Sequence, residues 1–190
     1  MTGDSDTPAS LLALADWRRQ MATLYAQARR LADSDPAVAL DHWRRVREHL
    51  YRAHPQSPIP PDRRTAFDAR HFPHDPALHL EVALLADDTR RRTPLALPIS
   101  RGGGDGAAMR FWRMGWIAVP LAGGLQGLVV FWMEGYAGGL FLPFRDTTNG
   151  TETHRIAYHP SCAVDPGWVC PLASTENWLD IPVGAGERTQ

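Results

Sequence analysis

The chain has 190 residues, which is enough for one compact domain with a hydrophobic core. Its 44% hydrophobic residues, 22% charged residues and formal net charge of -1 are typical of a soluble globular protein, so we expect neither nucleic acid nor a membrane among its partners. All 20 basic residues are arginine, which excludes chemistry that needs a Schiff-base lysine or a P-loop lysine.

The N-terminal stretch "MTGDSDTPASLLALADWRRQ" has no basic start and no uninterrupted apolar run, so we read no signal peptide in it. The longest apolar stretch, residues 115–144, contains Pro120 and Glu134 and is unsuited to one continuous membrane helix. These features predict a cytoplasmic protein. In that compartment two cysteines are more often free thiols than a structural disulfide.

Apolar residues near the N-terminus recur at alternating steps of three and four, which predicts an amphipathic helix over about residues 14–31. The stripe consists of Leu14, Trp17, Met21, Leu24, Ala28 and Leu31. It must pack either on its own domain or on a second copy of the chain, which would make a homodimer.

A second helix is predicted after "DSDP", with Asp35 as its N-cap and Pro36 as its first residue. It should end near His54, because proline at position 55 disfavours helical geometry in the residue before it. Its predicted apolar face contains Ala39, Trp43, Val46 and Leu50. Its predicted water-facing side chains are Arg44, Arg45, Arg47 and Glu48.

After a proline-rich connector the apolar pattern changes to alternation, which predicts strands over residues 78–84, 95–99, 108–119 and 128–133. Glycine-rich stretches between them, "SRGGGDG", "AGGLQG" and "EGYAGG", are typical of hairpin turns. We therefore predict a mainly β, α+β fold, in which an antiparallel barrel or sandwich carries a helical N-terminal segment. We divide the chain into an N-terminal helical extension, residues 1–36, and a second domain, residues 37–190.

Two stretches near the C-terminus, "LFLPFRDTTNGTET" and "YHPSCAVDPGWVCPLASTENWLDIPVGAGE", resemble the signature of a bacterial and archaeal family, domain of unknown function 1684. The matching positions are Phe144, Arg145, Asp146, Thr148, Gly150, Glu152, Thr153, Tyr158, Pro160, Cys162, Cys170, Pro171, Leu172, Glu176, Asn177, Ala185, Gly186 and Glu187. The likeness begins near Asp41 and leaves the first helix outside. Relatives carry an additional hairpin between the threonine-rich turn and the cysteine loop, and His159 stands where they usually have asparagine. The resemblance implies no activity, because the family is named for having none assigned.

A charged cluster inside or beside apolar strands is the candidate catalytic site: Arg145, Asp146, Glu152 and Glu176. An arginine fork binds carboxylate or phosphate, and a carboxylate in a partly dry pocket can act as general acid or base. The competing interpretation is an ion-pair and loop-capping network that ties the "RDTTNGTET" and "STEN" segments together. The candidate substrate contacts are Arg113, Trp112, Trp132, Tyr158 and Asn177, and Arg110 is a second arginine that could serve a flat anionic molecule beside the tryptophans.

The two cysteines, Cys162 and Cys170, enclose a loop and admit several interpretations. They could be buried thiols, a disulfide pair, a nucleophile, or metal ligands together with His154 and His159. We expect no metal, because the histidines depart from the family pattern while the cysteines belong to it.

The sequence thus predicts a small-molecule-binding protein, with cofactor-independent acid/base chemistry (hydrolysis, cyclisation or isomerisation) in a β-barrel pocket as the leading hypothesis. We expect no organic cofactor. The alternative is a non-catalytic ligand-binding or assembly module that dimerises through the N-terminal helix.

Overall fold

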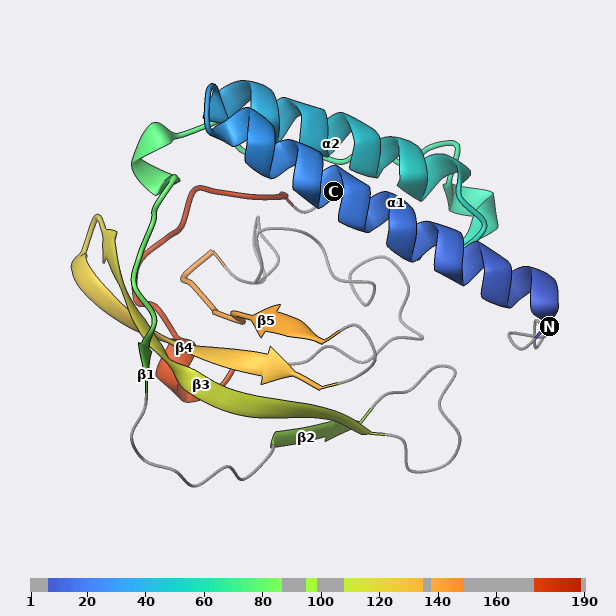
Figure 1. Ribbon diagram of the computed structural model, residues 1–190. Coiled ribbons are helices and arrows are strands. Elements are labelled where there is room, and N and C mark those ends of the chain that lie inside the picture. The colour runs from blue at the N-terminus through green and yellow to red at the C-terminus, as the bar shows by residue number, and fades with distance from the viewer. Residues whose placement is uncertain (1–6, 87–94, 99–107, 135–137, 149–172, 189–190) are drawn as a thin grey trace. The chain divides into compact units, whose positions relative to one another are not determined.

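The computed structural model describes residues 7–86, 95–98, 108–134, 138–148 and 173–188. They fall into two compact units, one ending at Arg70 and one beginning at His71. The first contains two helices and the second an antiparallel sheet (Figure 1). Both helices lie in the first unit, where they pack on each other. A domain boundary after residue 36 stays a prediction. None of the helices described is long and apolar enough to cross a membrane.

Helix α1 spans Pro8–Ala32 and starts earlier than its apolar stripe indicated. Thr7 caps its N-terminus by accepting a hydrogen bond from the Ser10 backbone, and proline occupies the first turn. The predicted stripe is confirmed: all its members are buried or half-buried, and Leu24 is fully buried. Helix α1 packs on α2, so the stripe has a partner within the chain. Dimerisation stays a prediction.

Helix α2 spans Pro36–Ala53 and confirms the predicted capping. The Asp35 carboxylate accepts hydrogen bonds from the backbone N–H groups of Ala37 and Val38, at 3.0 and 3.1 Å. His54 is the C-cap residue and has extended backbone geometry, as the following proline requires.

Arg47 was predicted to face water, and this prediction is wrong. Its side chain is buried, with 2% of the residue exposed. The guanidinium donates a 2.7 Å hydrogen bond to the Tyr51 hydroxyl and lies 4.2 Å from the centroid of that ring and 5.1 Å from that of Trp43. A planar guanidinium stacks well between aromatic rings, so helical position alone did not decide its exposure. Burial raises the pKa of Tyr51 above its usual value.

The two helices are joined by polar contacts around His54, which is buried. Its Nε2 lies 3.3 Å from the Asp16 carboxylate on α1, and its Nδ1 accepts a hydrogen bond from the Gln56 backbone at 3.0 Å. The Gln56 side-chain amide donates to the Ser10 backbone and hydroxyl oxygens, both at 3.2 Å. The turn after α2 is thereby fixed to the first half of α1.

This arrangement predicts an acid-sensitive contribution from Asp16. Hydrogen bonds from Arg19, Gln20 and His54, with that from Arg19 the largest, lower the pKa of Asp16 from 3.8 to about 2. A carboxyl whose pKa is depressed by folding stabilises the folded state above its unfolded pKa, and this contribution is lost as pH falls from about 4 to about 2. We expect the difference in unfolding free energy between the wild type and Asp16→Asn, followed by helical circular dichroism, to shrink over that window. A difference that does not change with pH would contradict this origin.

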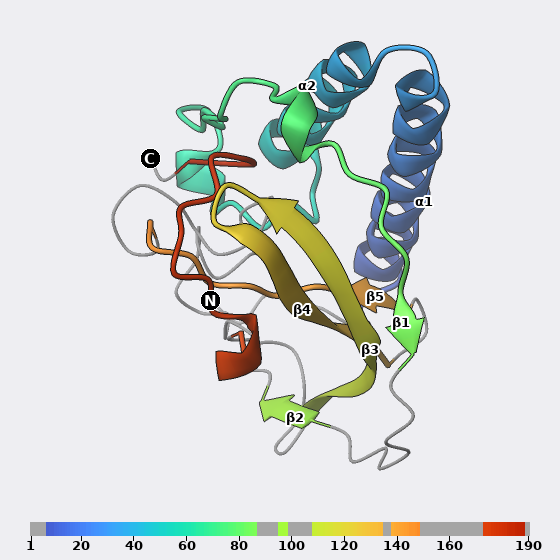
Figure 2. The same cartoon turned by 90° about the vertical axis from the view of Figure 1, so that its left-hand side faces the viewer.

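The second unit is built on an antiparallel sheet. Its strands are β1 (Leu85–Ala86), β2 (Leu95–Pro98), β3 (Ala108–Leu121), β4 (Gly124–Met133) and β5 (Gly139–Phe141). Strands β1 and β2 pair with successive parts of one edge of β3, whose other edge pairs with β4, and β4 in turn pairs with β5 (Figure 2). All four strand pairings are antiparallel, as predicted. The sheet is open in the described residues, so the chain is α+β, and neither barrel nor sandwich is confirmed.

The predicted strand over residues 78–84 is wrong. The segment starts with the 3-10 helix Pro76–Leu78, which Asp75 caps, and continues without regular structure to β1. Its Leu80 packs against the core of the sheet, whereas Val82 and Leu84 are exposed, so the apolar alternation does not mark the buried face of a strand. The hairpin predicted at "AGGLQG" is confirmed, because residues 122–123 form the two-residue turn between β3 and β4, with Gly124 at a φ of +98°.

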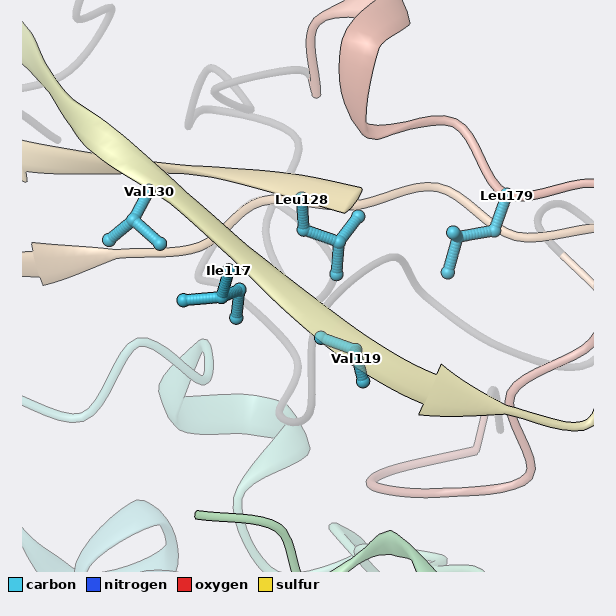
Figure 3. Close-up of a cluster of buried hydrophobic side chains, with 5 residues drawn as sticks. All are labelled: Ile117, Val119, Leu128, Val130 and Leu179. Carbon is cyan, nitrogen blue, oxygen red and sulfur yellow. The ribbon is translucent and has the colours of Figure 1, made fainter. Parts of the chain in front are cut away.

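The two faces of the β3–β4 pair carry separate apolar clusters, as alternation along paired strands requires. One buried cluster, completed by the C-terminal segment, consists of Ile117, Val119, Leu128, Val130 and Leu179 (Figure 3). The other consists of Phe111, Val129 and Phe131. The C-terminal segment therefore reaches the sheet where the candidate site residues lie.

Candidate functional site

The candidate site begins where the chain leaves β5. Arg145 forms an isolated parallel bridge with Trp178, in which its N–H donates to the Asn177 carbonyl at 2.9 Å and its carbonyl accepts from the Leu179 N–H at 2.7 Å. Two segments about 30 residues apart in sequence are thereby held in fixed register. This backbone bridge joins the described start of "RDTTNGTET" to the "STEN" segment, and the ion-pair part of the predicted network stays a prediction.

Asn177, a predicted substrate contact, supports the backbone. Its side chain is fully buried; Oδ1 accepts from the Val129 N–H at 2.6 Å, and Nδ2 donates to the carbonyls of Val129 and Pro143 at 2.9 and 2.6 Å. Continuing the β4–β5 register would place Pro143 opposite Val129. Proline has no N–H for that pairing, and the Asn177 amide supplies the missing donor. Both N–H groups of the Asn177 side-chain amide therefore have acceptors.

Asp146, a predicted catalytic residue, is buried and caps a turn. Its Oδ1 accepts from the backbone and hydroxyl of Thr148, at 3.2 and 2.8 Å, and its Oδ2 accepts from the Val183 N–H at 2.7 Å. Both carboxylate oxygens therefore have donors, two of them backbone groups. This geometry agrees with the loop-capping interpretation of Asp146.

Arg145 differs from its neighbours because its side chain is only half-buried. The guanidinium carbon lies 4.7 Å from the centroid of the Trp178 ring, and the Trp178 indole N–H donates to the Ala173 carbonyl at 3.2 Å. Within the described part of the chain, the Arg145 guanidinium makes no hydrogen bond and no ion pair with a side chain. An arginine stacked on an indole keeps its in-plane N–H groups available for an anion.

Glu176 and Arg113, predicted as catalytic and substrate-binding residues, form an ion pair. The Arg113 Nη1 lies 2.6 Å from the Glu176 Oε1, and both side chains are exposed. An exposed pair of this kind contributes little to stability, on the order of 0 to 1 kcal/mol. It does connect β3 to the 3-10 helix Thr175–Asn177, next to Trp178.

The predicted contacts Trp112 and Trp132 face each other across β3 and β4 as a directly opposed pair. Arg113 follows Trp112 in the strand, so its side chain points to the opposite face. Arg113 therefore lies on the other face of the sheet from the two tryptophans. A single small ligand on either face cannot contact all three side chains.

Several predicted residues lie outside the described residues: Glu152, Tyr158, Cys162, Cys170, His154 and His159. Their roles stay predictions, including the thiol, disulfide and metal alternatives. The described residues contain no group of three or more His, Cys, Asp or Glu side chains able to hold a metal ion.

One buried polar pair was missed by the sequence reasoning about sites. Glu187 is buried, and its Oε1 lies 3.5 Å from the His71 Nε2. The two residues also form an antiparallel bridge, which joins the first residues of the second unit to its last. The glutamate that closes the family signature was the available signal, but nothing in the sequence pointed to its partner.

The fold and these ties define an α+β protein whose C-terminal segment is fastened to an antiparallel sheet. The model of the family described as "Protein of unknown function (DUF1684)" matches residues 66–156 and 154–188, and the chain belongs to this family. The two matched segments meet at residues 154–156, where the hairpin of relatives was predicted to be absent. The match starts later than the likeness predicted from Asp41.

A solved relative shares the fold. The solution NMR structure of an uncharacterized protein from Haloarcula marismortui is 27% identical and superposes with a TM-score of 0.56, covering 80% of this chain and 93% of its own. No curated protein matches the chain.

Proposed function

We propose that this protein binds a small anionic molecule through Arg145. The observation that carries this proposal is the Arg145 guanidinium, which is accessible, stacked on Trp178 and without a hydrogen-bonding or ionic partner among the described residues. A planar guanidinium with free in-plane donors recognises carboxylate or phosphate by paired hydrogen bonds.

The surroundings of Arg145 support binding because they hold it in place. Its backbone is fixed on both sides by the bridge to the segment around Trp178. Asn177, whose carbonyl accepts from the Arg145 N–H, attaches its segment to Val129 and Pro143. Asp146, the next residue in the chain, accepts a hydrogen bond from the Val183 N–H. Binding loses less affinity to ordering when the anchoring group is already positioned.

Acid/base catalysis is the finer form of this proposal, and Glu176 is the described residue best suited to it. The oxygens of Asp146 are taken by donors, whereas the Glu176 carboxylate is exposed and contacts Arg113 through one oxygen. A general acid or base must exchange protons with substrate, which Glu176 is accessible enough to do. Glu176→Gln should then abolish turnover of a bound substrate while leaving its Kd within about threefold of the wild-type value. Loss of binding in Glu176→Gln, with no turnover by the wild type or by the variant, would support the non-catalytic alternative.

Arg145→Gln tests the binding proposal. A panel of small carboxylates and phosphates should contain compounds that raise the Tm of the wild type, because a ligand that binds only the folded state stabilises it. We expect Arg145→Gln to remove that shift while its own Tm without ligand changes by no more than about 4 °C, since a half-buried side chain with no ionic partner among the described residues contributes little to stability.

Arg188→Gln is the matched control, because Arg188 is also an arginine stacked on an aromatic ring, 5.2 Å from the centroid of Phe72. It should retain the ligand-induced shift. An equal loss of the shift in both variants would indicate a general charge effect and defeat the proposal. A large fall in the Tm of Arg145→Gln alone would assign Arg145 a structural role.

A further inference from the structure

A second surface of the sheet carries an exposed tryptophan and a half-buried one that the Arg145 site does not use. Trp112, Trp132 and Leu140 are cross-strand neighbours on β3, β4 and β5, and we call them the tryptophan platform. Trp132 is 40% exposed and Leu140 68% exposed, although the same face is buried farther along the strands at Val130. The platform thus continues an apolar face beyond the part that the described residues bury.

The platform is preorganised. The Trp112 indole N–H donates to the Glu134 carboxylate at 3.3 Å, which favours one orientation of that ring. Trp132 is supported from one side by Gly138, where even an added Cβ atom would lie only 3.1 and 3.2 Å from the indole carbons. Rigid aromatic surfaces lose little conformational freedom when a ligand stacks on them.

A positively charged side chain, that of Arg110, lies at the end of the platform. The Glu134 N–H donates to the Arg110 carbonyl at 2.8 Å, which extends the β3–β4 pairing by one position. Arg110 precedes Trp112 by two residues in β3, so the two side chains lie on the same face of the sheet. Arg110 is exposed, and its side chain has no hydrogen bond or ion pair with the residues that the structure describes. Glu134, which lies opposite Arg110, accepts its hydrogen bond from the indole N–H of Trp112.

We infer that the tryptophan platform binds a small aromatic carboxylate, with its ring on Trp132 and Leu140 and its carboxylate on Arg110. A flat ring matches the exposed indole, and a carboxylate matches the guanidinium fork by charge and by geometry. Arg113 cannot take part, because it lies on the other face of β3. The inference is independent of Arg145 and Trp178, so the two sites can fail separately.

The test uses the full-length chain labelled with 15N and observes the indole N–H resonances of its seven tryptophans. The probes are indole-3-acetate and its uncharged analogue indole-3-acetamide. Trp112→Phe and Trp132→Phe each remove one resonance and so assign the two platform signals. We expect indole-3-acetate to shift these two signals saturably, and the amide to shift them with a weaker Kd.

Arg110→Gln should raise the Kd of indole-3-acetate at least about tenfold and leave that of indole-3-acetamide unchanged, because only the acid uses the guanidinium. Arg188→Gln should change neither value. Absence of a saturable shift up to about 10 mM probe, a range that covers even weak ligands, would overturn the inference. So would shifts confined to Trp178, which report the Arg145 site, or platform shifts that depend on protein concentration without probe, which would indicate self-association.

Discussion

Replacing Asn177 with alanine is expected to lower the free energy of unfolding by about 3 to 5 kcal/mol, because it strands several buried backbone groups at once. The Asn177 amide provides the hydrogen-bond partners of the Val129 N–H and carbonyl and of the Pro143 carbonyl, and it is fully buried. Water cannot replace a partner at a site closed to solvent without opening the structure.

Chemical denaturation followed by tryptophan fluorescence measures this loss, and native-state hydrogen exchange at the Val129 amide locates it. Asp180→Asn is the control, because Asp180 is an exposed residue of the same segment and should change stability by less than about 0.5 kcal/mol. A loss below about 1 kcal/mol for Asn177→Ala would show that the amide is not a principal attachment of the C-terminal segment.

The second large effect is expected at Gly115, where β3 contains a bulge. Its φ is +154°, and a Cβ atom would lie 2.2 Å from the Leu85 carbonyl oxygen, which belongs to the backbone of β1. Neither the conformation nor the contact suits alanine. We expect Gly115→Ala to break the pairing of β1 with β3 and to lower the free energy of unfolding by about 3 kcal/mol or more.

Gly127→Ala is the matched control on the neighbouring strand. A Cβ atom there would meet only the Trp116 ring, at the ordinary contact distance of 3.9 Å, so we expect a change of less than about 1 kcal/mol. Urea denaturation of both variants decides the matter. Equal losses in the two would mean that any added side chain disturbs the sheet and that the close approach of β1 is not the cause.

The sequence was most informative where local chemistry decides structure. Asp35 and Pro36 predicted the start of α2, and proline at position 55 predicted its end, because caps and proline act within a few residues. The glycines at 123 and 124 predicted the β3–β4 hairpin for the same reason.

It was least informative where a contact joins distant segments. The alternation over residues 78–84 lies in an irregular segment, in which Leu80 packs on the sheet while Val82 and Leu84 are exposed. The burial of Arg47 depends on two aromatic rings. The same limit applies to the site: the sequence selected Asn177, but its role follows from meeting Pro143 and Val129, which no local pattern encodes. Residues with backbone partners and residues open to a ligand look alike in a signature.

The most direct test of an anion site at Arg145 is native mass spectrometry of the freshly purified full-length chain beside Arg145→Gln and Arg188→Gln. We expect an additional mass of a small acid on the wild type and on Arg188→Gln, released on denaturation and absent from Arg145→Gln. The same bound mass on all three proteins, or none on any of them after incubation with the stabilising acids of the panel, would contradict it.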